Sequence, residues 1–116
     1  MSPVVRLASV SDAEAMLAAS QSRPVLLFKH SSSCPVSALA SRHVSALDAP
    51  DDPPRYMVVV QKARAVSDWL AGALDVRHET PQAVLIAAGT AVHVASHGRV
   101  RTAALRAAVR AHVDSL

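Results

Sequence analysis

The sequence contains a single cysteine, Cys34, and this scarcity limits both its structure and its setting. One cysteine cannot form an internal disulfide, and a lone thiol fits a reducing compartment. No apolar run approaches the length of a membrane span, and residues 1–6 lack the apolar core of a signal peptide. We therefore expect a cytoplasmic protein with no membrane partner.

Aromatic and glycine residues are also few: the chain has one Phe, one Tyr, one Trp and three glycines. Lys and Arg outnumber Asp and Glu by 12 to 9, and the arginines are spread along the sequence. A nucleic-acid surface needs a basic stripe and stacking aromatics, so we expect no nucleic-acid partner. The 51% apolar content favours one globular domain over residues 1–116, which we expect to be a monomer.

The order of the expected helices and strands indicates an α/β protein. A Ser-x-x-Glu capping box at residues 11–14 predicts a first helix to about residue 20, followed by a buried strand over residues 25–28. Apolar spacing and turn signals then predict a helix over residues 34–47, a strand over 56–60, a helix over 61–74, strands over 82–88 and 91–97, and a helix over 101–113.

Two details of this prediction concern the last elements. Gly89-Thr90 is a two-residue hairpin signal between the last two strands, and Leu105, Val109 and Val113 are expected to face inward from the last helix. The order α-β-α-β-α-β-β-α indicates a thioredoxin-like fold, with a four-stranded mixed sheet flanked by helices.

Cys34 is the strongest candidate for a reactive residue in the sequence, and it lies between a polar turn at residues 31–33 and Pro35. Proline is best tolerated at the first position of a helix, so Pro35 places the cysteine at the N-cap. There its sulfur can accept hydrogen bonds from the amides of Val36 and Ser37, and the helix dipole favours the thiolate. The alternative is a buried structural cysteine, which the serine turn and the proline-led helix make the weaker interpretation.

Four segments in the chain carry a family likeness. They are Lys-His-Ser-Ser-Ser-Cys-Pro-Val-Ser at residues 29–37, the segment 58–67, Val-Arg-His-Glu-Thr-Pro-Gln at residues 76–82, and Ala-Ser-His at residues 95–97. Together they resemble the monothiol bacilliredoxins, thioredoxin-fold proteins of bacteria that use bacillithiol as their small thiol. Ser33 stands where the family is expected to have threonine or arginine, and Gly98 where an aromatic is expected.

The resemblance implies a thiol-disulfide oxidoreductase that removes bacillithiol from mixed disulfides on client proteins. Bacillithiol would be the co-substrate, with no tightly bound cofactor. Cys34 would attack the bacillithiol sulfur from its site before Pro35. Ser37 occupies the position of the second cysteine in a Cys-x-x-Cys motif, and its hydroxyl cannot resolve a disulfide. We expect this hydroxyl to donate a hydrogen bond to the thiolate instead.

Six further residues are candidates for substrate binding: His30, Ser33, His78, Glu79, Thr80 and Pro81. In this fold the position of Pro81 favours a cis peptide beside the cysteine, with Thr80 offering backbone groups to the substrate chain. An ordinary trans proline at the start of a strand is the alternative.

Lys29 and His30 could each support the thiolate, but neighbours on a strand face opposite ways, so at most one points toward Cys34. A structural or solvated role stays open for both residues. His78 and Glu79 are placed in the bacillithiol pocket only by the resemblance, and a solvated loop is the alternative.

We expect no dedicated metal site, because His93 and His97 would lie about 13 Å apart along a strand. Three other functions remain open. They are a glutathione-dependent, glutaredoxin-like monothiol enzyme, a non-catalytic module that docks clients along Pro81, and an iron-sulfur carrier that bridges a cluster between two Cys34 residues.

Overall fold

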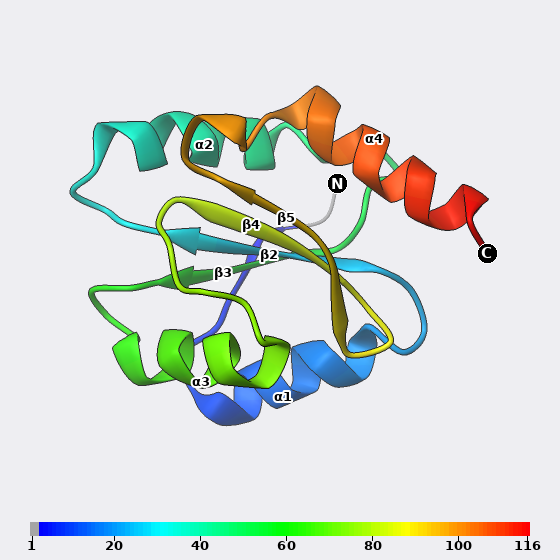
Figure 1. The fold of residues 1–116 in the computed structure, drawn as a ribbon. Coiled ribbons are helices and arrows are strands. Elements are labelled where there is room, and N and C mark those ends of the chain that lie inside the picture. Colours follow the sequence, from blue (N-terminus) through cyan, green and yellow to red (C-terminus); the bar gives the residue numbers. More distant parts are fainter. Residues whose placement is uncertain (1–2) are drawn as a thin grey trace.

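A five-stranded mixed sheet runs through the centre of the computed structural model, which describes residues 3–116 (Figure 1). Met1 and Ser2 lie outside the described residues, and with them part of the segment in which no signal peptide was expected. The elements are β1 (Val5–Arg6), α1 (Val10–Ala19), β2 (Val25–His30), α2 (Pro35–Ser45), β3 (Arg55–Val59), α3 (Arg64–Leu74), β4 (Gln82–Ala87), β5 (Thr90–Ser96), the 3-10 helix η1 (His97–Arg99) and α4 (Thr102–Asp114).

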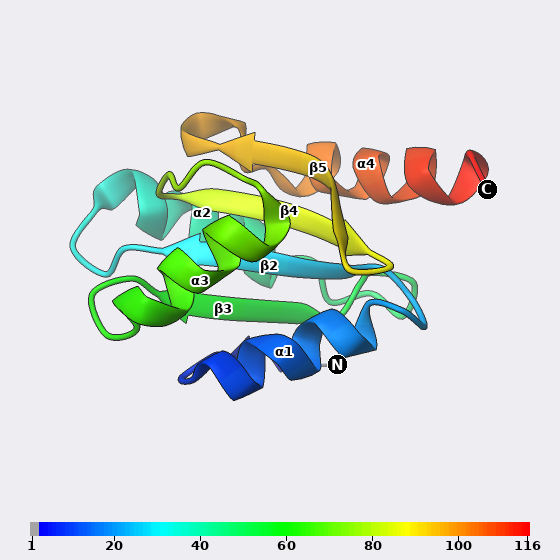
Figure 2. The same cartoon turned by 60° about the horizontal axis from the view of Figure 1, so that its bottom comes forward.

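The strand order in the sheet is β1-β3-β2-β4-β5, and helices cover both faces. Strands β1, β3 and β2 are parallel, whereas β4 is antiparallel to both β2 and β5. Helices α1 and α3 lie on one face of the sheet, and α2 and α4 lie on the other (Figures 1 and 2). This arrangement confirms the predicted thioredoxin-like class.

The predicted number of four strands was wrong, because β1 adds a fifth at one edge. It is only two residues long and pairs with Tyr56 and Met57 of β3. Two residues are too few to show the alternation by which a strand is recognised in a sequence.

Strand β2 is buried on both faces, as its unbroken apolar run predicts. Val25 and Leu27 pack into the core beneath α1 and α3, and Leu26 and Phe28 pack into the core beneath α2. The alternation continues to the end of the strand, so Lys29 and His30 also face opposite sides of the sheet.

The first helix begins earlier than its predicted capping box. Ser9 is the N-cap, and its hydroxyl accepts a hydrogen bond from the amide of Asp12 at 3.1 Å. The carboxylate of Asp12 accepts from the Ser9 amide in return, at 3.2 Å. The box proposed at residues 11–14 was therefore wrong. The same spacing of serine and acid, two residues earlier, forms it.

The hairpin turn lies one residue before its predicted position, at Ala88-Gly89. Both residues have positive φ angles, 52° and 73°, as a two-residue turn between antiparallel strands requires. Ser20 holds the turn: its carbonyl accepts from the Ala88 amide at 2.8 Å, and its hydroxyl accepts from the Gly89 amide at 2.9 Å. This distant partner explains why an alanine tolerates the left-handed conformation.

Helix α4 is only partly packed on the sheet. Leu105 is buried as predicted and Val109 is half-buried, but Val113 is 51% exposed, so its predicted inward position was wrong. The second half of the helix runs past the end of the sheet (Figures 1 and 2). Among residues 3–116, no helix has the length and apolar character needed to cross a membrane.

Candidate active site

Cys34 lies at the turn that joins β2 to α2. It is the N-cap of α2, with extended backbone angles, and Pro35 is the first helical residue, as predicted. The thiol is free and half-buried. Its sulfur makes no hydrogen bond to the first helical amides, so the predicted capping bonds from Val36 and Ser37 were wrong. The backbone places the thiol, and the sulfur is left without a capping role.

The hydroxyl of Ser37 faces the end of β2. Ser37 is fully buried, and its oxygen accepts a hydrogen bond from the Ser31 amide at 2.9 Å and lies 2.8 Å from Nδ1 of His30. The sequence predicted that this hydroxyl would bond to the sulfur of Cys34, but its partners are the Ser31 amide and His30. Ser37 therefore ties the turn before the cysteine to the helix after it.

His30 is half-buried on the α2 side of the sheet. Burial lowers the pKa of its imidazole, and the positive charge of Arg6 lowers it further. A neutral ring can accept a hydrogen bond from the Ser37 hydroxyl at Nδ1. Of the two neighbours on β2, His30 is thus the one on the same side of the sheet as α2 and its N-terminal cysteine.

Lys29 points to the other face and is almost fully buried. Its ammonium nitrogen lies 3.4 Å from Nδ1 of His78, and the Ser67 hydroxyl lies 3.2 Å from the same atom. Burial lowers the pKa of Lys29, against the attraction of Asp68, which raises it. Burial and then the charge of Lys29 lower the pKa of His78. These contacts fasten the start of the 77–81 loop to β2 and α3.

The Thr80–Pro81 peptide bond is cis, as predicted. Gln82 pairs with Lys29 in the β2–β4 ladder, so Pro81 lies beside the end of β2 from which the turn to Cys34 departs. Pro81 is buried and Thr80 is half-buried. The backbone of Thr80 therefore lies at the same end of the sheet as the cysteine.

His97 holds this loop from the other side, and it was not predicted as a site residue. Its amide donates to the carbonyl of Pro81 at 2.7 Å, and its Nε2 lies 2.7 Å from Oε2 of Glu79. The φ angle of His97 is +56°, a left-handed conformation that is uncommon outside glycine. The contact spans 18 residues, so only the family-like segment at residues 95–97 could have drawn attention to it.

A second residue that sequence analysis missed is Gln61, in the turn after β3. Its side-chain amide donates to the hydroxyls of Ser31 and Ser33, at 2.8 and 3.1 Å, and its oxygen accepts from the Ser32 amide at 3.2 Å. The predicted binding residue Ser33 thus has a structural contact of its own. Gln61 fixes the shape of the serine turn that precedes Cys34.

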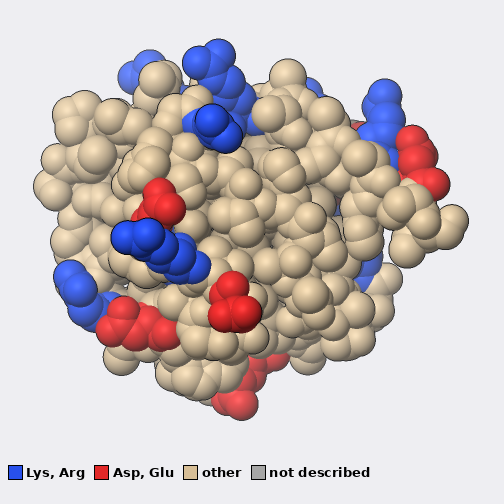
Figure 3. All heavy atoms as spheres, viewed as in Figure 1, with Lys and Arg blue, Asp and Glu red and all other residues tan. Residues whose placement is uncertain are grey.

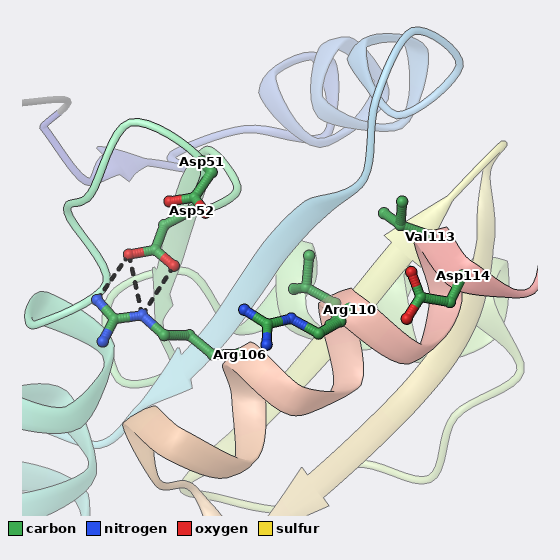
Figure 4. A pocket seen from close by; sticks show the side chains of 7 residues that line it. Asp51, Asp52, Arg106, Arg110, Val113 and Asp114 are labelled. Carbon is green, nitrogen blue, oxygen red and sulfur yellow. Dashed lines mark hydrogen bonds and ion pairs between the residues drawn. The ribbon is translucent and has the colours of Figure 1, made fainter.

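The hollow beside α4 is separate from this site and contains none of the predicted residues. It has a volume of about 330 Å³ and lies between α4 and the loop before β3, with the guanidinium of Arg106 clamped on the carboxylate of Asp52 (Figure 4). On the face shown in Figure 3 the Lys and Arg side chains are scattered, and several lie beside acidic ones. Among residues 3–116, no three His, Cys, Asp or Glu side chains are grouped so as to hold a metal ion.

Comparison with known proteins agrees with this geometry. Residues 5–105 match the family described as Monothiol bacilliredoxin BrxC. The chain belongs to the monothiol bacilliredoxin family. A solved structure described as having a thioredoxin fold is 30% identical, with a TM-score of 0.82 over 90% of this chain and 92% of the other. The family and this neighbour identify the chain as a thiol-disulfide oxidoreductase.

More distant structures share the fold alone. Fasciola hepatica thioredoxin is 19% identical, with a TM-score of 0.76 over 94% of this chain and 99% of the other. Malassezia sympodialis thioredoxin is 15% identical, with a TM-score of 0.77 over 97% of this chain and 92% of the other. The family match, and not these thioredoxins, carries the connection to bacillithiol.

Proposed function

We propose that this protein removes bacillithiol from mixed disulfides on client proteins, with Cys34 as the attacking thiolate. The observation that carries the proposal is the placement of the one free thiol. Cys34 is accessible at the N-cap of α2, at the same end of the sheet as the cis-Pro81 loop, in a chain of the monothiol bacilliredoxin family. A lone thiol suits a reducing compartment such as the cytoplasm.

The reaction is a thiol-disulfide exchange. The thiolate of Cys34 attacks the bacillithiol sulfur and forms a new disulfide with it, while the disulfide between bacillithiol and the client breaks. The client sulfur leaves as a thiolate and takes up a proton from water. A second small thiol must then attack the Cys34–bacillithiol disulfide, because the Ser37 hydroxyl cannot act as a resolving thiol.

The surrounding residues have supporting roles in this proposal. Pro35 starts the helix that presents the thiol, and Ser33 shapes the turn before it through Gln61. The backbone of Thr80, ahead of cis-Pro81, offers hydrogen-bonding groups to an extended client chain.

Three side chains hold the edges of the site in place. His78 and Glu79 anchor the loop through Lys29 and His97, and His30 anchors Ser37. In this proposal His78, Glu79 and His30 border the sulfur end of the space that bacillithiol occupies, next to Cys34, and their contacts keep that end in one shape.

Intact mass spectrometry after mixing the reduced protein with a bacillithiolated client tests the proposal. We expect the mass of one bacillithiol to appear on Cys34 as the client is released in its thiol form. A Cys34→Ser variant should release no client. The same client carrying glutathione should react more slowly, since the enzyme would then be using the wrong small thiol. A Cys34→Ser protein that still releases the client at the parental rate would refute the proposal.

A further inference from the structure

A groove of about 290 Å³ runs between α2 and η1, and the first residue of α2 that lines it is Val36, two positions after Cys34. Val36, Leu39 and His43 line one side of it, at helical spacings of three and four residues, so they form one face of α2 about 10 Å long. His97 and Arg101 line the other side. Val36 and Leu39 are 46% and 57% exposed and lie on the same face of the helix, so together they present apolar surface along the groove.

Arg101 is the one permanently charged residue in the lining of this groove, which contains no acidic residue. Nδ1 of His43 already accepts a hydrogen bond from the Thr102 amide at 3.1 Å, and His97 is engaged by Glu79. Arg101 differs from both. Its Nε donates to the Gly98 carbonyl at 3.0 Å, and its two terminal nitrogens have no protein partner among residues 3–116. Four N–H donors therefore remain available on a side chain that cannot lose its charge.

We propose that this groove binds the malate end of bacillithiol, with Arg101 as the partner of its carboxylates. Bacillithiol joins cysteine to glucosamine and malate, so its acidic groups lie at the end remote from the sulfur. A disulfide to Cys34 at one end of the groove leaves the rest of the molecule to extend along α2. The exposed side chains of Val36 and Leu39 then cover the C–H face of the sugar.

Charge complementarity favours this occupant. A guanidinium binds a carboxylate through two parallel hydrogen bonds, and the free terminal nitrogens of Arg101 provide that geometry. The carboxylate of Glu79 would repel malate, but it lies against His97 and is not part of the lining. The inference rests on the proposed function and adds which part of the small thiol is recognised.

An Arg101→Gln variant tests the inference when it is assayed on one client in two mixed-disulfide forms. One form carries bacillithiol, and the other carries uncharged 2-mercaptoethanol. We expect kcat/KM to fall about two- to fivefold with bacillithiol, the range for an exposed ion pair, and to stay unchanged with 2-mercaptoethanol. Arg101→Lys should retain part of the preference, and added salt should weaken it in the parental protein.

Arg99→Gln is the matched control, because Arg99 is an exposed arginine in η1, two positions before Arg101, and does not line the groove. It should leave both rates unchanged. An equal loss on both substrates in Arg101→Gln would assign Arg101 to an acidic client segment or to the structure of η1, and would overturn the inference. So would no loss on either substrate. A parental protein inactive on the bacillithiolated client would overturn the proposed function as well, so the two failures are distinguishable.

Discussion

Nε2 of His97 and Oε2 of Glu79 lie 2.7 Å apart, across the loop that carries cis-Pro81. The His97 amide binds the Pro81 carbonyl at the same time, so one residue holds the loop through both its side chain and its backbone. A non-glycine residue in the left-handed region costs roughly 1–2 kcal/mol. The neighbouring Gly98 would adopt that conformation more easily, yet the histidine occupies it, which indicates that the side chain is needed there.

Two substitutions at His97 separate its side chain from its backbone. Both His97→Gly and His97→Ala remove the contact with Glu79, but only glycine adopts a φ of +56° without strain. The alanine variant should therefore be less stable than the glycine variant by about 1 kcal/mol, measured by denaturant unfolding. Equal stabilities would show that the backbone relaxes and that the left-handed conformation does not depend on this residue.

Replacing Ser37 by cysteine should change the reaction route. Cys34 is the N-cap and residue 37 lies three positions later, so their Cβ atoms are about 5–6 Å apart and within reach of a disulfide after a small adjustment. In Ser37→Cys we expect the bacillithiol adduct to be short-lived, with bacillithiol released and a protein disulfide formed. Mass spectrometry over time distinguishes the two species.

The matched control is Ser37→Ala, which removes the hydroxyl without adding a thiol. It should keep the adduct, although it leaves the Ser31 amide and His30 without their partner and should cost about 1–3 kcal/mol of stability. A stable adduct in Ser37→Cys would contradict the expected route.

Protein stability should fall as the pH drops below about 6.5. Burial first, and then Arg6, lowers the pKa of His30, and burial and then Lys29 lowers the pKa of His78. Their ordinary value is 6.5, so the unfolded chain binds protons before the folded chain does. Protonation thus favours unfolding from about pH 6.5 down through the folded pKa values.

Thermal unfolding measured at intervals from about pH 7.5 to about pH 5 tests this prediction. A His78→Gln variant should show a shallower decline of Tm with acidity, because one of the two protonations that favour unfolding is gone. His112→Gln, in α4, is the control and should decline like the parental protein. Identical slopes for all three proteins would refute the role of His78.

Asp52 should stabilise the contact between α4 and the loop before β3. Its carboxylate, 6% exposed, binds the guanidinium of Arg106 at 2.8 and 3.0 Å and accepts from the Ala49 amide at 3.0 Å. The Arg106 hydrogen bond, followed by the Ala49 hydrogen bond, lowers the pKa of Asp52, and burial opposes them. We expect Asp52→Asn to cost about 1–2 kcal/mol of unfolding free energy at neutral pH.

The pH dependence of this loss has a definite sign. A lowered carboxyl pKa stabilises the fold above the ordinary value near 3.8, and that stabilisation disappears as the pH falls through the folded pKa. The difference between Asp52→Asn and the parental protein should therefore shrink in acid. Asp51→Asn, a change at the exposed neighbour, should have little effect at any pH. A loss that stayed constant into strong acid would argue against the ion pair.

Local patterns predict much of the fold and the central residue of the site. Pro35 after a serine turn places Cys34 at a helix N-cap, and the apolar run before it predicts a strand buried on both faces. The opposite orientations of Lys29 and His30 follow from the geometry of any strand. Each of these predictions depends on a few consecutive residues, and the structure confirms each of them.

Several of the errors arise where a distant partner decides the outcome. Ala88 adopts a turn conformation that alanine disfavours because Ser20 binds the turn from the end of α1. The Ser37 hydroxyl turns toward His30 because the end of β2 lies beside the first turn of α2. His97 and Gln61 were missed for the same reason, since each acts on a loop far from it in the sequence.

The unpacked end of α4 has a practical use. Its last turns run beyond the sheet, at the opposite end of the molecule from the turn that carries Cys34 (Figure 1). A fluorescent label or a surface tether attached after residue 116 would leave the thiol facing outward and accessible. Immobilised in this way, the protein would retain bacillithiol on Cys34 while the clients leave as free thiols, as the proposed exchange requires.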